Sequence, residues 1–212
     1  MGLPQIAPYP LPGEAELPRA RGPWTLARDR AALLVHDMQN YFLRVYAADA
    51  SPIAPVIANI AALAAACRLA GIPVFYTAQN GDQDRRDRGL QADIWGPGMT
   101  SAPEHQAITA ALAPQPEDFV LVKHRYSAFQ RSNLETLMRA RGRDQIVICG
   151  VYGHIGCMLT AAEAFQRDIE VFFIADAIAD FSRDRHDMAV DYVAERCGVP
   201  MTTRQLTAAL NP

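Results

Sequence analysis

Several polar groups that could transfer a proton or bind an anion each follow a short apolar run of the chain. Asp37 ends LLVHD, Gln79 follows VFYTA, Lys123 ends FVLVK, and a glycine-rich loop over residues 150–156 follows QIVIC. A carboxyl group can act as a general acid or base, and a loop that leads into a helix offers backbone N–H groups to an anion. A lysine at the end of an apolar strand must emerge into a cleft or find a buried partner, because burial of a lone ammonium group is costly.

The elements that position these groups alternate between strands and helices. Continuous apolar strands separated by amphipathic helices are typical of a parallel sheet covered on both faces. We therefore predict a three-layer α/β/α Rossmann-like fold with a central, mostly parallel six-stranded sheet. The carboxyl ends of its strands should bring the polar groups together. The predicted strands are residues 31–36, 73–78, 119–123, 145–149, 171–175 and 199–202, and the predicted helices are 52–70, 132–141, 157–167, 184–196 and 203–210.

Composition narrows the function classes. The 212 residues are 50% hydrophobic and 20% charged with a net charge of −3, which excludes a disordered chain and gives no basic excess for nucleic acid. The most apolar stretch, residues 52–71, is rich in alanine and contains Arg68, so we expect no membrane span. Four scattered cysteines without a CxxC pair favour reduced thiols and a cytoplasmic protein.

Two segments stand apart from the alternating pattern. Residues 1–25 carry six prolines and are predicted to form an extended arm, followed by one domain over residues 26–212. The stretch 79–103 is polar and then rich in Gly and Pro, and it is longer than an ordinary connection of about 4–6 residues. Long loops of this kind often cover a binding site.

Cys157 and the histidines need separate interpretation. Cys157 begins a predicted helix, where a thiol can become a nucleophile, but a buried structural cysteine is the alternative. The five histidines, His36, His105, His124, His154 and His186, lack metal-site spacing, so we expect structural or surface roles and no metal. Strand alternation predicts that His36 points away from Asp37.

Four segments are informative when taken together, namely LLVHDMQNYFL (33–43), DRGLQADIWGPGM (87–99), VKHRYSAF (122–129) and GVYGHIGCMLTAAEAFQRDIEVFFIADAIADFSRD (150–184). They resemble the isochorismatases, a family within the cysteine hydrolase superfamily. The resemblance runs from about residue 4 to residue 210 and implies a Rossmann-like hydrolase.

One position separates this chain from the amidohydrolases that it also resembles. Their nucleophilic cysteine lies six residues after the glycine that ends the fourth strand, which places Gly156 in that position, and Thr160–Ala161 supports this alignment. Cys157 lies one residue later, about 100° around the helix. The histidine of the nicotinamidase metal site is also missing after Thr77–Ala78. Both departures favour isochorismatase chemistry without a cofactor.

The resemblance implies hydrolysis of isochorismate to 2,3-dihydro-2,3-dihydroxybenzoate and pyruvate. A vinyl ether is cleaved by protonation of its methylene carbon, so one acid can suffice, and the resemblance assigns it to Asp37. That acid needs a pKa raised by burial, while Lys123 opposes the shift; we expect substrate carboxylates to neutralise Lys123. By resemblance, Arg88 and Lys123 meet carboxylates, Gln79 and Tyr152 form hydrogen bonds, and N–H groups at Gly156 receive a carboxylate. The candidate aromatic walls are Tyr41, Phe42, Trp95, Tyr126 and Phe129.

Other interpretations remain open from the sequence. The substrate could instead be 2-amino-2-deoxyisochorismate, as in phenazine biosynthesis, and siderophore biosynthesis is the context of the isochorismate reaction. A nicotinamidase-like cysteine amidohydrolase using Cys157, or a docking protein without activity, are further alternatives. The resemblance also implies a homodimer. Because it covers nearly the whole chain, we expect no aryl carrier domain, and any carrier or synthetase partner would be a separate protein.

Overall fold

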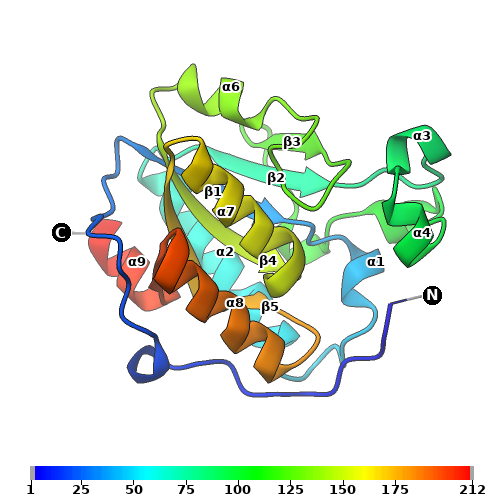
Figure 1. The fold of residues 1–212 in the computed structure, drawn as a ribbon, viewed down its shortest axis with the longest axis horizontal. Coiled ribbons are helices and arrows are strands. Elements are labelled where there is room, and N and C mark those ends of the chain that lie inside the picture. The colour runs from blue at the N-terminus through cyan, green and yellow to red at the C-terminus, as the bar shows by residue number, and fades with distance from the viewer. Residues whose placement is uncertain (1–2, 211–212) are drawn as a thin grey trace.

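The computed structural model describes residues 3–210, and its centre is one six-stranded sheet (Figure 1). The strand order is β3-β2-β1-β4-β5-β6, and every neighbouring pair is parallel. This confirms the predicted fold class, with a fully parallel sheet where a mostly parallel one was expected. The strands are β1 (Ala31–His36), β2 (Val74–Ala78), β3 (Phe119–Val122), β4 (Gln145–Val151), β5 (Glu170–Ala179) and β6 (Val199–Met201).

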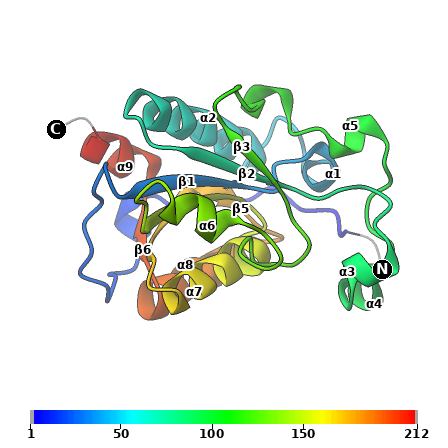
Figure 2. The same ribbon diagram turned by 90° about the horizontal axis from the view of Figure 1, so that it is seen from above.

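Helices cover both faces of the sheet (Figure 2). On one face lie α2 (Ile53–Leu69) and α9 (Thr203–Leu210), and on the other lie α6 (Leu134–Arg139), α7 (Met158–Gln166) and α8 (Arg183–Arg196). The alternation of β1 explains the two layers, because Leu33 and Val35 belong to one buried cluster while Leu34 belongs to the other. All six residues of β1 are buried, as expected for a central strand.

Two strands extend beyond the predicted ranges. β4 continues to Val151, and β5 runs ten residues from Glu170 to Ala179, with a register shift against β4 between Ile148 and Gly150. Gly150 has φ +116°, and a Cβ atom there would overlap the carbonyl oxygen of His36. The close approach of β4 to the end of β1 therefore requires glycine at this position.

The long connection after β2 contains short helices that the sequence did not predict. They are α3 (Arg85–Arg88) and α4 (Gln91–Trp95), and α5 (Pro103–Gln106) follows the connection. Asp84 caps α3 by accepting a hydrogen bond from the Arg86 N–H, and α1 (Asn40–Leu43) follows β1. Figure 1 shows α3 and α4 beyond the carboxyl ends of the strands, on the side where α1 begins.

The proline-rich segment at the N-terminus runs along the outside of the molecule with one 3-10 turn, η1 (Glu14–Glu16) (Figure 1). Its first two residues lie outside the described range. Ile6 and Tyr9 are buried in the core, and their N–H groups donate to the carbonyls of Val45 (2.9 Å) and Ser51 (3.2 Å). The segment therefore packs through side chains and a few backbone hydrogen bonds.

Between residues 3 and 210, none of the helices combines the length and the apolar character that crossing a membrane requires. The strand order reverses between β1 and β4, where chain connections leave the sheet in opposite directions. In an open parallel sheet, ligands bind at the carboxyl ends of the strands beside such a reversal. Asp37 follows β1 and the loop at 152–156 follows β4, so both lie at this point.

Candidate active site

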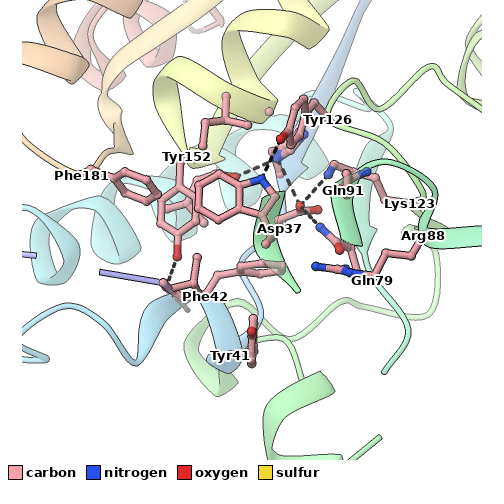
Figure 3. Close-up of a pocket in the computed structure, with 16 residues that line it drawn as sticks. Asp37, Tyr41, Phe42, Gln79, Arg88, Gln91, Lys123, Tyr126, Tyr152 and Phe181 are labelled. Atoms are coloured by element: carbon pink, nitrogen blue, oxygen red, sulfur yellow. Dashed lines mark hydrogen bonds and ion pairs between the residues drawn. The ribbon is translucent and has the colours of Figure 1, made fainter. Parts of the chain in front are cut away.

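A pocket lies at the reversal of strand order (Figure 3). The nine residues predicted for catalysis or substrate binding all line it, namely Phe42, Asp37, Gln79, Arg88, Trp95, Lys123, Tyr126, Tyr152 and Gly156. They come from five separate segments of the chain, which the fold brings to one edge of the sheet.

Asp37 lies at the bottom of this pocket, immediately after β1. Its Oδ1 accepts a hydrogen bond from the Thr77 hydroxyl (2.6 Å), and its Oδ2 accepts one from Nε2 of Gln79 (3.1 Å). The backbone N–H of Asp37 in turn donates to the Thr77 hydroxyl (3.0 Å). Asp37 has φ +49°, an unusual conformation for a residue with a side chain. Neighbouring strand β2 thus holds the carboxylate in one orientation.

Lys123 forms an ion pair with Asp37 inside the pocket. Its Nζ lies 2.8 Å from Oδ2, and the two side chains are only 3% and 6% exposed. Burial opposes ionisation of Asp37, but the ammonium of Lys123, together with His36 and the Thr77 hydroxyl, lowers the pKa of this carboxyl below its ordinary value. The opposing effect expected of Lys123 thus outweighs desolvation in the paired carboxyl, because the cation is in direct contact.

Arg88 supplies a second buried cation. The residue is 8% exposed, and its Nε donates to the carbonyl of Gly96 (2.6 Å). Burial lowers its pKa, partly offset by Tyr41 and Tyr126. Within residues 3–210, no carboxylate lies within ion-pair distance of its guanidinium. A buried arginine without an acidic partner in a pocket is suited to bind the carboxylate of a ligand.

Aromatic rings form the walls of the pocket. The indole N–H of Trp95 donates to the Tyr126 hydroxyl (2.7 Å), which joins α4 to the segment after β3. The hydroxyl of Tyr152 donates to the carbonyl of Phe42 (2.8 Å), and the Tyr152 ring packs against Phe181 at 4.6 Å. Tyr41 also lines the pocket. Phe129, the remaining candidate wall, does not; it is buried in the cluster beneath α7.

His36 lines the pocket, contrary to the sequence expectation. Strand alternation holds only while the backbone stays extended, and the positive φ of Asp37 interrupts it directly after His36. Both side chains consequently reach the pocket, with Nδ1 of His36 3.9 Å from Oδ2 of Asp37. Burial lowers the pKa of His36 to about 4, so its ring is neutral at physiological pH. No signal in the sequence marked this break in the alternation.

The predicted nucleophile alternative finds no support at Cys157. This cysteine is fully buried in the cluster with α7 and α8, and burial raises its pKa well above the ordinary value. Gly156, one residue earlier, faces the pocket from the π-helical turn Gly153–Cys157, which follows a cis peptide bond between Val151 and Tyr152. The pocket wall at the nucleophile position is therefore glycine.

Five further residues line the pocket that sequence reasoning did not select: Leu3, Gln91, Val151, Ile155 and Phe181. Gln91 belongs to α4 and donates to the carbonyl of His124 (2.8 Å). Four of them fall within the segments 87–99 and 150–184, which carry the family resemblance, so position within those motifs was the available signal. Leu3 comes from the N-terminal segment, and only the path of the chain brings it here.

The arrangement combines one carboxyl group, two cations and an apolar wall. It can bind an anionic ring compound and transfer a proton from or to Asp37. In the described part of the chain, no three or more His, Cys, Asp or Glu side chains gather in a way that could hold a metal ion.

Comparison with known proteins agrees with the fold. The family model "Isochorismatase domain" matches residues 31–205. The chain is 49% identical to the isochorismatase of Bacillus subtilis over 206 residues, covering 97% of this chain and 66% of that protein. The chain thus spans just under two thirds of the length of that relative.

Two other matches extend the comparison. The chain is 47% identical to the phenazine biosynthesis protein PhzD1 of Pseudomonas aeruginosa, covering 97% of this chain and 98% of that protein. A crystal structure of a cysteine hydrolase from Pseudomonas syringae pv. phaseolicola superimposes with a TM-score of 0.82 at 26% identity, covering 91% and 97% of the two chains. Together with the parallel sheet and the pocket at its switch point, these matches show that the chain is a hydrolase and belongs to the isochorismatase family.

Proposed function

We propose that this protein is an isochorismatase, which hydrolyses the enolpyruvyl ether of isochorismate to 2,3-dihydro-2,3-dihydroxybenzoate and pyruvate. The observation that carries the proposal is the buried Asp37 carboxyl, held by Thr77, Gln79 and Lys123 in a pocket whose nucleophile position is glycine. The substrate is a dianion with an apolar ring. Lys123 and Arg88 offer one cation to each carboxylate, and the aromatic walls enclose the ring.

The reaction proceeds by proton transfer to carbon. Asp37 donates its proton to the methylene carbon of the vinyl ether, which leaves an oxocarbenium ion. Water adds to this ion, returns a proton to Asp37 and forms a hemiketal. The hemiketal collapses as its hydroxyl proton passes to the former ether oxygen, and the bond between this oxygen and the hemiketal carbon breaks, so that pyruvate and the dihydrodiol are released. The general acid contributes about 10²–10⁴-fold to such steps.

Protonation of Asp37 must accompany substrate binding in this scheme. Lys123 lowers the pKa of Asp37, so the paired carboxyl is ionised at neutral pH. A substrate carboxylate that binds Lys123 withdraws this stabilisation and adds a negative charge nearby, and both effects raise the Asp37 pKa. The buried position of Asp37 then favours the neutral acid. Binding should therefore take up a proton from solution.

The amino analogue of isochorismate is the second candidate substrate. The likeness to PhzD1, a phenazine biosynthesis protein, supports it. The two compounds differ at one ring substituent, so steady-state kinetics with both, compared as kcat/KM, decide between them. A siderophore pathway is the expected context for isochorismate, and a phenazine pathway for the amino analogue.

The test of the proposed function is release of pyruvate from isochorismate, measured through lactate dehydrogenase. Wild type and Cys157→Ala should both be active, with and without EDTA, whereas Asp37→Ala should lose nearly all turnover. Loss of activity in Cys157→Ala, with inactivation by iodoacetamide, would instead support a cysteine amidohydrolase. Retained activity in Asp37→Ala refutes the mechanism. If wild type releases no pyruvate from either substrate, the docking-protein interpretation takes its place.

We also propose a cytoplasmic homodimer that works with separate carrier or synthetase proteins. The family resemblance supports the dimer. So does a cleft beside α4 that is lined by the exposed side chains of Leu90 (78%), Ile94 (58%) and Leu159 (38%). Light scattering on wild type and on Ile94→Asp tests this, because a charge in the interface should yield monomers. The division into an arm over residues 1–25 and a hydrolase domain over residues 26–212 is part of the same proposal.

A further inference from the structure

Gly156 and His36 compete for the same space in the pocket wall. A Cβ atom built on Gly156 would overlap Cε1 of the His36 ring and would lie 2.8 Å from Nε2 and 3.0 Å from Nδ1. Side-chain atoms do not approach a ring this closely. Any residue with a side chain at position 156 therefore requires the His36 ring to move.

Packing and a hydrogen bond oppose movement of the His36 ring. The residue is 1% exposed, and its Nδ1 forms a hydrogen bond of 2.8 Å with the carbonyl of Val151. The backbone of His36 is held as well, because it pairs with Gly150 in the β1–β4 ladder and a Cβ atom on Gly150 would already overlap its carbonyl oxygen. The ring thus lies in a fixed place between two strands and the loop.

The backbone at Gly156 is equally constrained. Thr160, fully buried on α7, donates its hydroxyl hydrogen to the Gly156 carbonyl (2.6 Å) and accepts a hydrogen bond from the Ala128 N–H (3.0 Å). The next residue, Cys157, is fully buried, and its N–H donates to the carbonyl of Tyr152 (3.2 Å). A retreat of the loop from His36 would break these contacts.

We propose that His36 is a positioning residue that keeps position 156 free of a side chain and so commits this pocket to acid chemistry without a protein nucleophile. By the resemblance to the cysteine amidohydrolases, position 156 is where their thiol stands, and here the imidazole occupies the space that a Cβ atom at this position would need. The hydrogen bond from Nδ1 to the Val151 carbonyl holds the ring in this volume. The effect of His36 on the reaction rests on the proposed function. The steric conflict between the His36 ring and a side chain at position 156 does not depend on it.

A stability cycle tests the steric relation. The variants are Gly156→Ala, His36→Val and the double variant, each measured by urea unfolding. With His36 present, Gly156→Ala should lower the folding equilibrium constant at least about tenfold, as overpacking does, whereas in the His36→Val background the same change should cost less than about threefold. His36→Ala provides a second background if His36→Val folds poorly. His186→Val, which removes another buried histidine that does not line the pocket, should leave the cost of Gly156→Ala unchanged.

A reactive thiol provides a second readout that stability alone would not change. Gly156→Cys is combined with Cys157→Ala, so that any alkylated thiol in the 150–158 peptide belongs to position 156. With His36→Val, iodoacetamide should alkylate this cysteine at least about tenfold faster than with His36, since the thiol then fits beside Lys123. Equal alkylation rates in both backgrounds, or equal costs of Gly156→Ala, overturn the proposal. Neither readout uses isochorismate, so failure of pyruvate release would remove the proposed function and leave this relation standing.

Discussion

Removal of either member of the Asp37–Lys123 pair should destabilise the fold more than removal of both. The two groups lie 2.8 Å apart and are almost completely buried. Asp37→Asn keeps the shape and removes the negative charge, and Lys123→Met keeps the length of the side chain and removes the positive one. Each single variant leaves one buried charge without its counter-ion.

The expected magnitudes follow from the geometry. At 2.8 Å and an effective dielectric constant of about 20, two unit charges attract by about 6 kcal/mol. Desolvation offsets part of this, so we expect each single variant to lose about 3–5 kcal/mol of unfolding free energy. The double variant leaves no buried charge, and replacement of a buried pair by apolar groups is often close to neutral. We therefore expect it to lose about 0–2 kcal/mol.

The assay combines urea unfolding with pyruvate release on the same preparations. The double variant should recover stability yet remain inactive, because the acid is absent. Asp144→Asn is the matched control: Asp144 forms a 2.7 Å ion pair with Arg30, but both side chains are 39% exposed. Its loss should cost less than about 1 kcal/mol, as for other surface pairs.

Additive losses would refute this reasoning. If the double variant loses the sum of the two singles, about 6–10 kcal/mol, the charges are not coupled and Lys123 does not control the ionisation of Asp37. Activity in either Asp37 variant would separately remove the acid role of Asp37.

Four further outcomes are expected. If substrate binding protonates Asp37, kcat/KM should fall about tenfold per pH unit above the lowered pKa of Asp37 in the free enzyme, whereas kcat should stay constant to higher pH. Identical pH profiles of kcat and kcat/KM would argue against protonation on binding. Arg88→Met should raise KM about 10- to 150-fold, and Arg88→Lys should restore only part of this, because lysine lacks the planar fork; an unchanged KM would mean that no substrate carboxylate binds there. Trp95→Phe removes the hydrogen bond to Tyr126 and should increase the rate of limited proteolysis within residues 79–103, and an unchanged rate would show that this bond does not hold the segment. Tyr9→Phe removes the hydroxyl oxygen that accepts a hydrogen bond of 2.7 Å from the Asp180 N–H, and it should lower the free energy of unfolding in urea by about 1–3 kcal/mol. Tyr192→Phe, at an exposed position, should cause no measurable loss.

Periodicity in the sequence was sufficient to predict the layers of the fold. The strand at 31–36 and the helix at 203–210 have the predicted bounds, because their apolar patterns end at turn or cap residues. β5 extends past the predicted 171–175, since pairing with β4 beyond its register shift continues the strand to Ala179. Two short helices in residues 79–103 were missed because a single helical turn has no periodicity to detect.

The composition of the pocket could be predicted better than its electrostatics. Of the residues chosen from strand ends and from the family motifs, all but Phe129 line one pocket, because parallel strands place their carboxyl ends at a common edge. The pKa of Asp37 could not be predicted, since burial and Lys123 act in opposite directions and the distance between the two groups decides the outcome.

The sequence by itself determined the alternation of strands and helices, the acid and the cations at strand ends, and the glycine in the nucleophile position, because these are properties of residue type and spacing. Only the tertiary structure decided that His36 shares the pocket with Asp37, that Cys157 is buried behind the wall, and that the N-terminal segment reaches the pocket through Leu3. Each of these depends on one backbone torsion, one helical rotation or the path of a distant segment. Local sequence patterns do not encode such relations, because the groups involved meet only when the sheet is complete.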